Sequence, residues 1–151
     1  MVDKTTWNST ALTTPGKSAD LSSIAMDDKG TIAVVWQRTD GLHQRIQSRI
    51  YNPTTASWSA VMTLSTLGVN AIHPDISVDG NGGATAAWTE WNSASGRYLP
   101  MIKKYSPPTW TGAFDNNYNN PANWSSNTVP TANNDIIIPP GASIDISGDL
   151  N

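Results

Sequence analysis

Short runs of strand-forming residues alternate with clusters of polar turn residues through much of the chain. Alternating apolar and polar positions predict strands, and Gly, Pro, Asn and Asp predict the turns between them. The turns fall at Asp-Asp-Lys-Gly (27–30), around Asp40-Gly41 and at Pro53. The strands predicted between them lie at residues 21–26, 31–37, 44–51 and 58–64.

This pattern occurs twice. The stretch SIAMDDKGTIAVVW at 23–36 aligns with DISVDGNGGATAAW at 75–88, so that Ile24 matches Ile76 and Trp36 matches Trp88, 52 residues apart. The flanking segments repeat as well. Tyr-Asn-Pro (51–53) matches Tyr-Ser-Pro (105–107), and WNSTAL (7–12) matches WSAVMTL (58–64). We therefore predict an outer strand at 7–12, a complete unit at 19–64 and a second unit at 71–106 that lacks its outer strand.

A repeat of about fifty residues with four antiparallel strands is typical of a β-propeller blade, whereas the coil of a parallel β-helix is usually much shorter. The pattern from Trp7 to Tyr105 resembles the repeats of sialidase-type and related secreted bacterial propellers. It departs from the strict Asp-box of sialidases, because Trp36 and Trp88 lie six residues beyond the glycine. The resemblance implies an all-β fold: residues 1–107 form part of a propeller, with two antiparallel blades.

Propellers close with about four to eight blades, so two blades do not complete a ring. Two explanations stay open. We favour the first, in which the chain is a fragment of a longer propeller. In the second, a neighbouring copy donates its spare strand at 7–12 to the incomplete unit, giving a homo-oligomer.

The sequence changes character from residue 108 to residue 151, where asparagine becomes frequent and the repeat ends. The motifs Trp-Thr-Gly (110–112), Asn-Trp (123–124) and Val-Pro-Thr (129–131) resemble the start of a β-rich module of Bacteroidetes-type secreted surface proteins. That resemblance implies an exported, cell-surface or extracellular parent protein. We expect an irregular, truncated module with short strands at 135–138 and 143–146.

Composition and charge restrict which partners and sites we expect. Charged residues make up only 14%, the net charge is −3 and cysteine is absent. We therefore expect no nucleic-acid partner, no disulfides and no zinc site. No segment has the apolar length of a membrane span or of a signal peptide, so we expect any export signal to lie elsewhere in the parent.

The candidate ligand-binding residues are Glu90, Trp91 and Tyr98. Glu90 is the only glutamate and lies in WTEWN, where flanking aromatics favour either a carboxylic acid with a raised pKa or a hydrogen bond to a stacked sugar. Strand alternation places Trp88 with Glu90 on one face and Trp91 on the other. Trp91 and Tyr98 are expected in the longer loop of the second unit, where ligand contacts concentrate.

We expect no metal ion and no cofactor. Asp27 and Asp79 precede glycine turns, where carboxylates ordinarily cap backbone N–H groups, although calcium binding stays open. Arg45 and Arg49 are expected outside the sheet, away from a catalytic centre. The sequence thus favours a non-enzymatic recognition or structural segment that binds a glycan or a protein. The alternative is a fragment of a propeller glycosidase or sialidase-like enzyme whose catalytic residues lie outside this chain.

Overall fold

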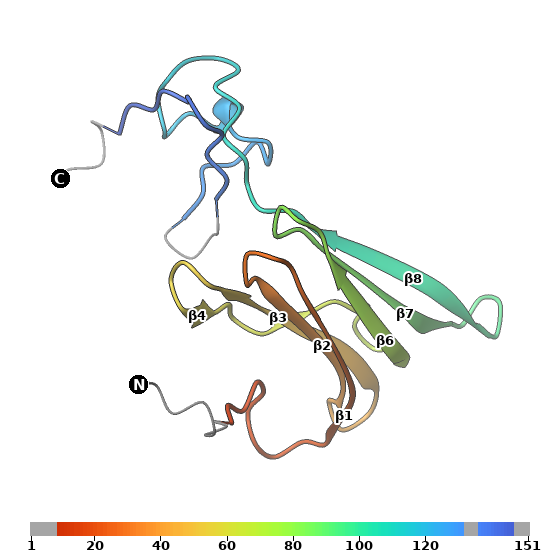
Figure 1. Ribbon diagram of the computed structural model, residues 1–151. Coiled ribbons are helices and arrows are strands. Elements are labelled where there is room, and N and C mark those ends of the chain that lie inside the picture. The colour runs from red at the N-terminus through yellow and green to blue at the C-terminus, as the bar shows by residue number, and fades with distance from the viewer. Residues whose placement is uncertain (1–8, 132–135, 147–151) are drawn as a thin grey trace, which may run out of the picture.

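The computed structural model describes residues 9–131 and 136–146 and is all-β. Its described residues contain eight strands, one short 3-10 helix and no α-helix (Figure 1). The strands form two separate antiparallel sheets, which confirms the predicted fold class and excludes a parallel solenoid over this span. The elements are β1 (Ala19–Met26), β2 (Ile32–Thr39), β3 (Gln44–Asn52), β4 (Ser57–Trp58), β5 (Met62–Thr63), β6 (Ala71–Val78), β7 (Ala84–Asn92), β8 (Arg97–Tyr105) and η1 (Pro121–Asn123).

The first sheet, which we call sheet A, has the order β1-β2-β3, with β4 and β5 both paired to β3. The predicted fourth strand at 58–64 is thus present but interrupted. Tyr51 pairs with Trp58, and Ser48 pairs with Met62. Between these points Ser59 donates its backbone N–H to Ile50 O at 2.8 Å, so the segment follows the edge of β3 throughout.

The second sheet, sheet B, has the order β6-β7-β8 and no fourth strand among the described residues, as predicted. The repeat extends to backbone detail. Both first strands contain a register shift, and it coincides with a positive φ at Leu21 (46°) and at His73 (56°), which are 52 residues apart. Residues other than glycine rarely adopt a positive φ. Its recurrence at equivalent positions therefore indicates that the two copies share the same backbone conformation, including the irregularity in the first strand.

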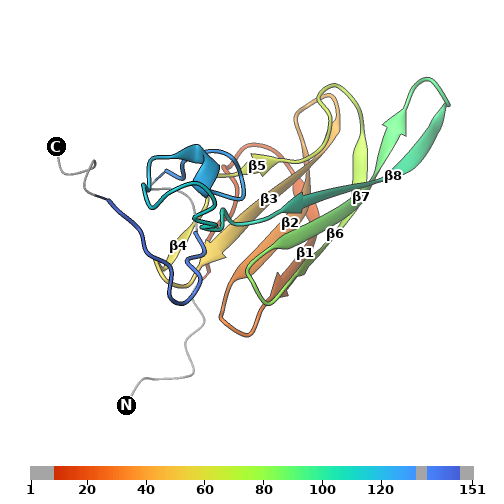
Figure 2. The ribbon, with the colours of Figure 1, turned by 90° about the horizontal axis from the view of Figure 1, so that it is seen from above.

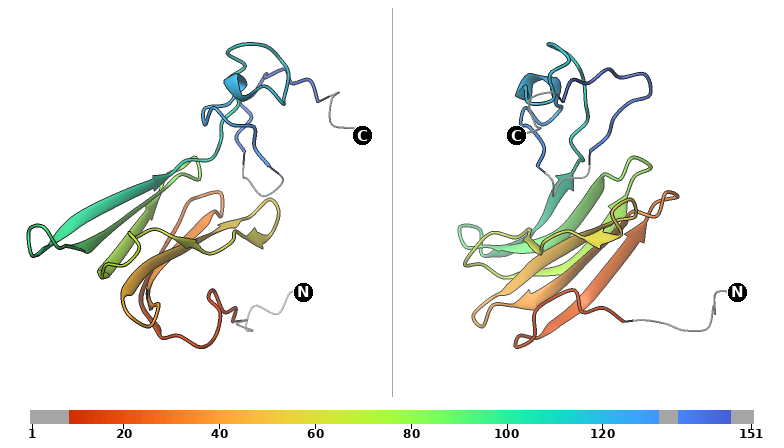
Figure 3. Two further views of the ribbon diagram at one scale, coloured as in Figure 1. Left: turned by 180° about the vertical axis from the view of Figure 1, so that it is seen from behind. Right: turned by 90° about the vertical axis from the view of Figure 1, so that its left-hand side faces the viewer.

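The two sheets lie face to face, and the core fills the space between them (Figures 1 and 3). Sheet A contributes Val35 and Ile46, and sheet B contributes Ala71, Ala86 and Trp88. All five side chains are at most 5% exposed. Burial of apolar area at this interface is the main stabilising contribution, because a single sheet cannot cover its own apolar face.

The first strands of the two sheets, β1 and β6, are neighbours in space (Figure 2). The Ser23 hydroxyl donates to Asp75 Oδ1 at 2.7 Å, and the Lys29 ammonium donates to Gly80 O at 2.6 Å. Ser23 and Asp75 are themselves 52 residues apart. Equivalent strands therefore lie side by side, as they do where repeats are stacked around an axis.

The N-terminal segment differs from the prediction. Residues 9–12 belong to no strand, while Trp7 and Asn8 lie outside the described residues. The segment lies against the face of sheet A that is turned away from sheet B (Figure 3). There Arg38 donates to Thr14 O at 3.0 Å and Arg49 donates to Leu12 O at 3.5 Å. The outer edge of β3 is already paired with β4 and β5, so this segment has no free edge of β3 to join.

The C-terminal segment from residue 108 is irregular and is held by aromatic and amide contacts rather than by a sheet. Trp124 makes edge-to-face contacts with Trp110 and Tyr118, and Asn123 is fully buried. The strands expected at 135–138 and 143–146 are reduced to single bridges at Ile137 and Asp145, and Asp135 itself is outside the described residues. Each bridge pairs with an isolated position, Thr109 or Asn117, so neither can extend into a ladder.

Candidate functional site

The aromatic residues of β7 separate onto the two faces of sheet B. Trp88 is 5% exposed and packs in the core between the sheets, whereas Trp91 is 39% exposed on the opposite face. The period-2 alternation of a strand explains the separation, and it confirms the assignment made from WTEWN. Trp91 is thus the tryptophan of this motif that a ligand can reach.

Trp91 and Tyr98 lie directly opposite each other on β7 and β8. Their ring centroids are 5.4 Å apart in an edge-to-face arrangement, and Tyr98 is 42% exposed. The structure thus brings these two predicted site residues together. It also corrects their location, because both lie in strands rather than in a loop. The hairpin loops are residues 40–43 and 93–96, so the extra length of the second copy extends the strands instead.

Glu90 shares the inner face with Trp88 and is buried, with 7% exposure. Its Oε2 accepts the indole N–H of Trp88 at 3.1 Å and the backbone N–H of Thr66 at 3.0 Å. Burial alone would raise the pKa of Glu90, but the hydrogen bonds from Thr66 and Trp88 and the nearby positive charge of Arg45 outweigh it and hold the pKa below its ordinary value. A carboxylic acid with a raised pKa is therefore the wrong description of this group.

The Glu90 carboxylate fastens β7 to the loop that leads from sheet A into sheet B, because Thr66 lies in that loop. Its charge is engaged by donors within the protein. Structure and sequence thus disagree about one predicted site residue. Glu90 lies one position from Trp91 in the chain, but alternation directs the two side chains to opposite faces.

Arg45 and Arg49 make separate contacts within the protein. Arg45, which was expected outside the sheet, is buried: it donates to Ser65 O at 2.9 Å and lies 3.8 Å from Asp40. Arg49 donates to Ser59 O at 2.7 Å, and its guanidinium lies 6.0 Å from the centre of the Trp58 ring. Both guanidinium groups thus bind parts of their own sheet and its adjoining loops.

The aspartates of the glycine turns cap backbone groups, in the same way in both copies. Asp27 Oδ1 accepts the N–H groups of Lys29 and Thr31, and Asp79 Oδ1 accepts those of Asn81 and Gly83. Burial acts to raise the pKa of Asp27, but the N–H groups of Thr31 and Lys29 keep it below the usual value. Among the described residues, no group of three or more His, Asp or Glu side chains is arranged to hold a metal ion.

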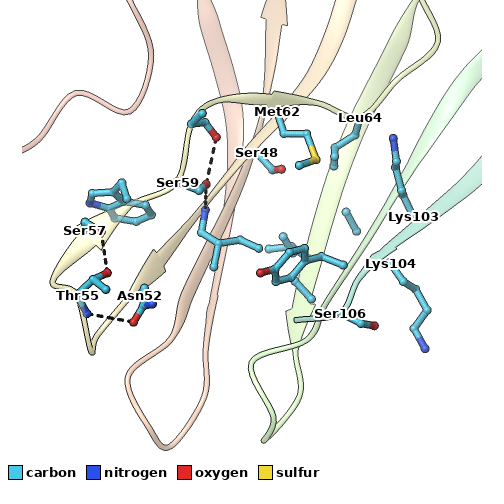
Figure 4. A pocket seen from close by; sticks show the side chains of 17 residues that line it. Ser48, Asn52, Thr55, Ser57, Ser59, Met62, Leu64, Lys103, Lys104 and Ser106 are labelled. Carbon is cyan, nitrogen blue, oxygen red and sulfur yellow. Dashed lines mark hydrogen bonds between the residues drawn. The ribbon is translucent and has the colours of Figure 1, made fainter. Parts of the chain in front are cut away.

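A cleft of about 770 Å³ opens between the outer parts of the two sheets, and sequence reasoning missed it (Figure 4). One wall comes from β3 to β5 and includes Ser48, Met62 and Leu64. The other comes from sheet B and the residues that follow it, including Lys103 and Lys104. The signal that could have located it was the absence of a fourth strand from the second repeat, because the cleft adjoins the edge at which that strand would lie.

Comparison of the chain with models of protein families and with curated proteins gives no match. Within residues 9–131 and 136–146, no helix has the length and apolar character needed to cross a membrane.

Proposed function

We propose that this chain is a non-enzymatic recognition segment of a secreted or cell-surface bacterial protein, and that the pair Trp91 and Tyr98 contacts a glycan or protein ligand. The observation that carries the proposal is the exposure of two adjoining aromatic rings on the outer face of sheet B. The extracellular setting is supported by the resemblance of the repeats and of the C-terminal motifs to those of exported bacterial proteins.

The aromatic pair is specific to the second copy. The equivalent positions in sheet A are Thr39 and Gln44, which are also paired across the hairpin. The repeat architecture therefore forms without aromatic rings at this place. An exposed pair of rings offers a flat apolar surface with one polar hydroxyl, which suits the apolar face of a sugar ring or an apolar side chain of a protein.

The environment of Glu90 argues against glycosidase chemistry at this position. A general acid needs to be protonated near neutral pH, whereas the contacts of Glu90 stabilise its charged form. The carboxylate is also buried on the face opposite to Trp91. We therefore assign Glu90 a structural role and restrict the proposed ligand contact to Trp91 and Tyr98.

A glycan array probed with the purified chain tests the proposal. We expect binding to a subset of glycans, and we expect Trp91→Ala and Tyr98→Ala to weaken it at least tenfold. Leu99→Ala is the matched control, because Leu99 is 39% exposed on the next position of β8 but points to the other face. Wild-type binding by Trp91→Ala would contradict the assigned site, and a chain that binds no glycan would contradict glycan recognition.

A further inference from the structure

Sheet B lacks the strand that completes sheet A, and the two edges concerned are equivalent. Tyr51 at the end of β3 and Pro53 just after it match Tyr105 at the end of β8 and Pro107 just after it, 54 residues further along the chain. The outer edge of β3 carries β4 and β5, whereas β8 ends its sheet among the described residues. Sheet A thus shows how a fourth strand pairs with this type of edge.

The backbone bonds of the fourth strand in sheet A are made at specific positions. Ile46 O accepts the N–H of Leu64, and Ile50 O accepts the N–H of Ser59, both at 2.8 Å. The N–H groups of Ile46 and Ile50 are bonded instead by the hydroxyls of Ser65 and Ser59. At these two positions the strand therefore relies on the carbonyl groups of β3.

The corresponding positions in β8 are Pro100 and Lys104. Proline blunts a sheet edge because it has no N–H to donate, and lysine does so through its charge. However, the fourth strand of sheet A makes no backbone bond to the N–H at the position equivalent to Pro100. Pro100 and Lys104 thus make the β8 edge unfavourable for most strands. The edge is still compatible with a strand that donates its N–H groups to the carbonyls of these two residues, as Leu64 and Ser59 donate to Ile46 and Ile50 in sheet A.

The cleft provides room for the side chains of such a strand. Every second side chain of a strand added to β8 would point toward sheet A, because side chains alternate across a sheet. Sheet A lines the cleft there with Met62 and Leu64 beside β3 (Figure 4). Sheet B lines it with Ile76 and Ala86. The apolar side chains Leu99 and Met101 of β8, 39% and 38% exposed, face the same way and would be covered.

We propose that the β8 edge and this cleft receive residues 7–12 of a second copy of the chain as the fourth strand of sheet B. The segment WNSTAL begins with Trp and ends with Leu, as the one-residue-longer WSAVMTL does in sheet A. The chain's own segment starts from the far face of sheet A, where Arg38 bonds Thr14 O at 3.0 Å and Arg49 bonds Leu12 O at 3.5 Å. Donation to another copy keeps the Thr14 bond and requires release of the longer Leu12 bond. The donor is therefore a neighbouring copy.

The association is head to tail. Each copy offers one donor segment and one acceptor edge, and these lie at different places on the molecule. Contacts of this kind generate a closed ring when the rotation between copies returns to the start, and an open chain when it does not. A dimer closed by two reciprocal donations is the smallest such ring.

The first test measures the mass of the full chain by size-exclusion chromatography with light scattering over a hundredfold range of concentration. We expect oligomers that grow with concentration in the wild-type chain and a monomer in Trp7→Ala and in Ile102→Pro. Ile102 is equivalent to Ser48, which pairs with Met62, so the proline removes an N–H on the outer edge and leaves pairing with β7 intact. Trp7 precedes every strand in the sequence, and circular dichroism of its variant checks that both sheets are kept. Ile24→Asp, on sheet A, is the control and should associate like the wild type.

The second test uses fluorescently labelled peptides with the sequences of residues 5–13 and 57–65, and a scrambled version of the first. We expect the 5–13 peptide to bind the full chain and to lose at least tenfold in affinity on Ile102→Pro. Binding of the 57–65 peptide alone would overturn the N-terminal segment as occupant and indicate a strand from another repeat. A monomer at every concentration that binds neither peptide would overturn the proposal.

Discussion

Replacing Glu90 tests whether this buried carboxylate is structural. Glu90→Ala removes the acceptor of two hydrogen bonds and leaves the indole N–H of buried Trp88 without its partner. Hydrogen bonds to a charged group contribute about 1.5 to 3 kcal/mol, and an unpaired buried donor costs about 1 to 3 kcal/mol. Because the backbone N–H of Thr66 can donate to a water molecule instead, we expect a loss of about 3 kcal/mol in the free energy of unfolding.

Urea denaturation followed by tryptophan fluorescence measures this loss. With a urea dependence of about 2 kcal/mol per molar, the midpoint should fall by about 1.5 M. Glu90→Gln retains an acceptor oxygen and should lose about 1 to 2 kcal/mol, while Trp88→Phe isolates the indole bond. A Glu90→Ala variant within about 0.5 kcal/mol of the wild type would refute the structural role.

The same variants give a pH dependence with a defined sign. The folded pKa of Glu90 lies below its unfolded value of about 4.5, so the charge stabilises the fold above that pH. This contribution is lost as the pH falls from about 4.5 through the folded pKa. The unfolding free energy of the wild type should therefore fall more steeply than that of Glu90→Gln over this window. Parallel curves for the two proteins would show that the folded pKa equals the unfolded one, and a shallower fall in the wild type than in Glu90→Gln would show that burial outweighs the hydrogen bonds.

Three further substitutions test the repeat, the interface and the C-terminal segment. Gly82→Ala places a side chain at φ +75° in the second glycine turn and should cost about 1 kcal/mol in urea denaturation, whereas Gly80→Ala, with open space around it, should change stability by less than about 0.5 kcal/mol. Ile46→Ala, at a fully buried position, should cost about 3 kcal/mol, and Ile24→Ala, at 67% exposure, less than about 0.5 kcal/mol; equal effects would contradict the interface. Asn123→Ala removes the side-chain oxygen that accepts two loop amides, so hydrogen exchange at those amides should become faster. Unchanged protection of these amides would show that Asn123 does not hold the loop.

Most of the strand order could be predicted from the sequence, because each strand is bounded by turn residues with a local physical role. The repeat made the prediction stronger, since Asp27 and Asp79 cap the same backbone positions in both copies. The interruption of the fourth strand at Ser59 was not predictable. There the hydroxyl of Ser59, in place of a backbone carbonyl, accepts the N–H of Ile50, nine residues earlier in the chain.

The candidate site was only partly predictable, because exposure depends on which face of a sheet meets another sheet. Alternation correctly separated Trp88 from Trp91. It could not show that the inner face would bury Glu90 next to the loop carrying Thr66, or that Arg45 would be buried at the sheet edge. Composition near Glu90 suggested a reactive acid, but the donors that set its pKa come from elsewhere in the chain.

Proton–proton contacts measured by NMR on the isotopically labelled chain test the packing of the two repeats most directly. The account predicts cross-peaks between the ring protons of Trp88 and the methyl groups of Val35 or Ile46, because these residues form one buried cluster from opposite sheets. A Trp88 ring that contacts only residues of its own sheet would contradict it.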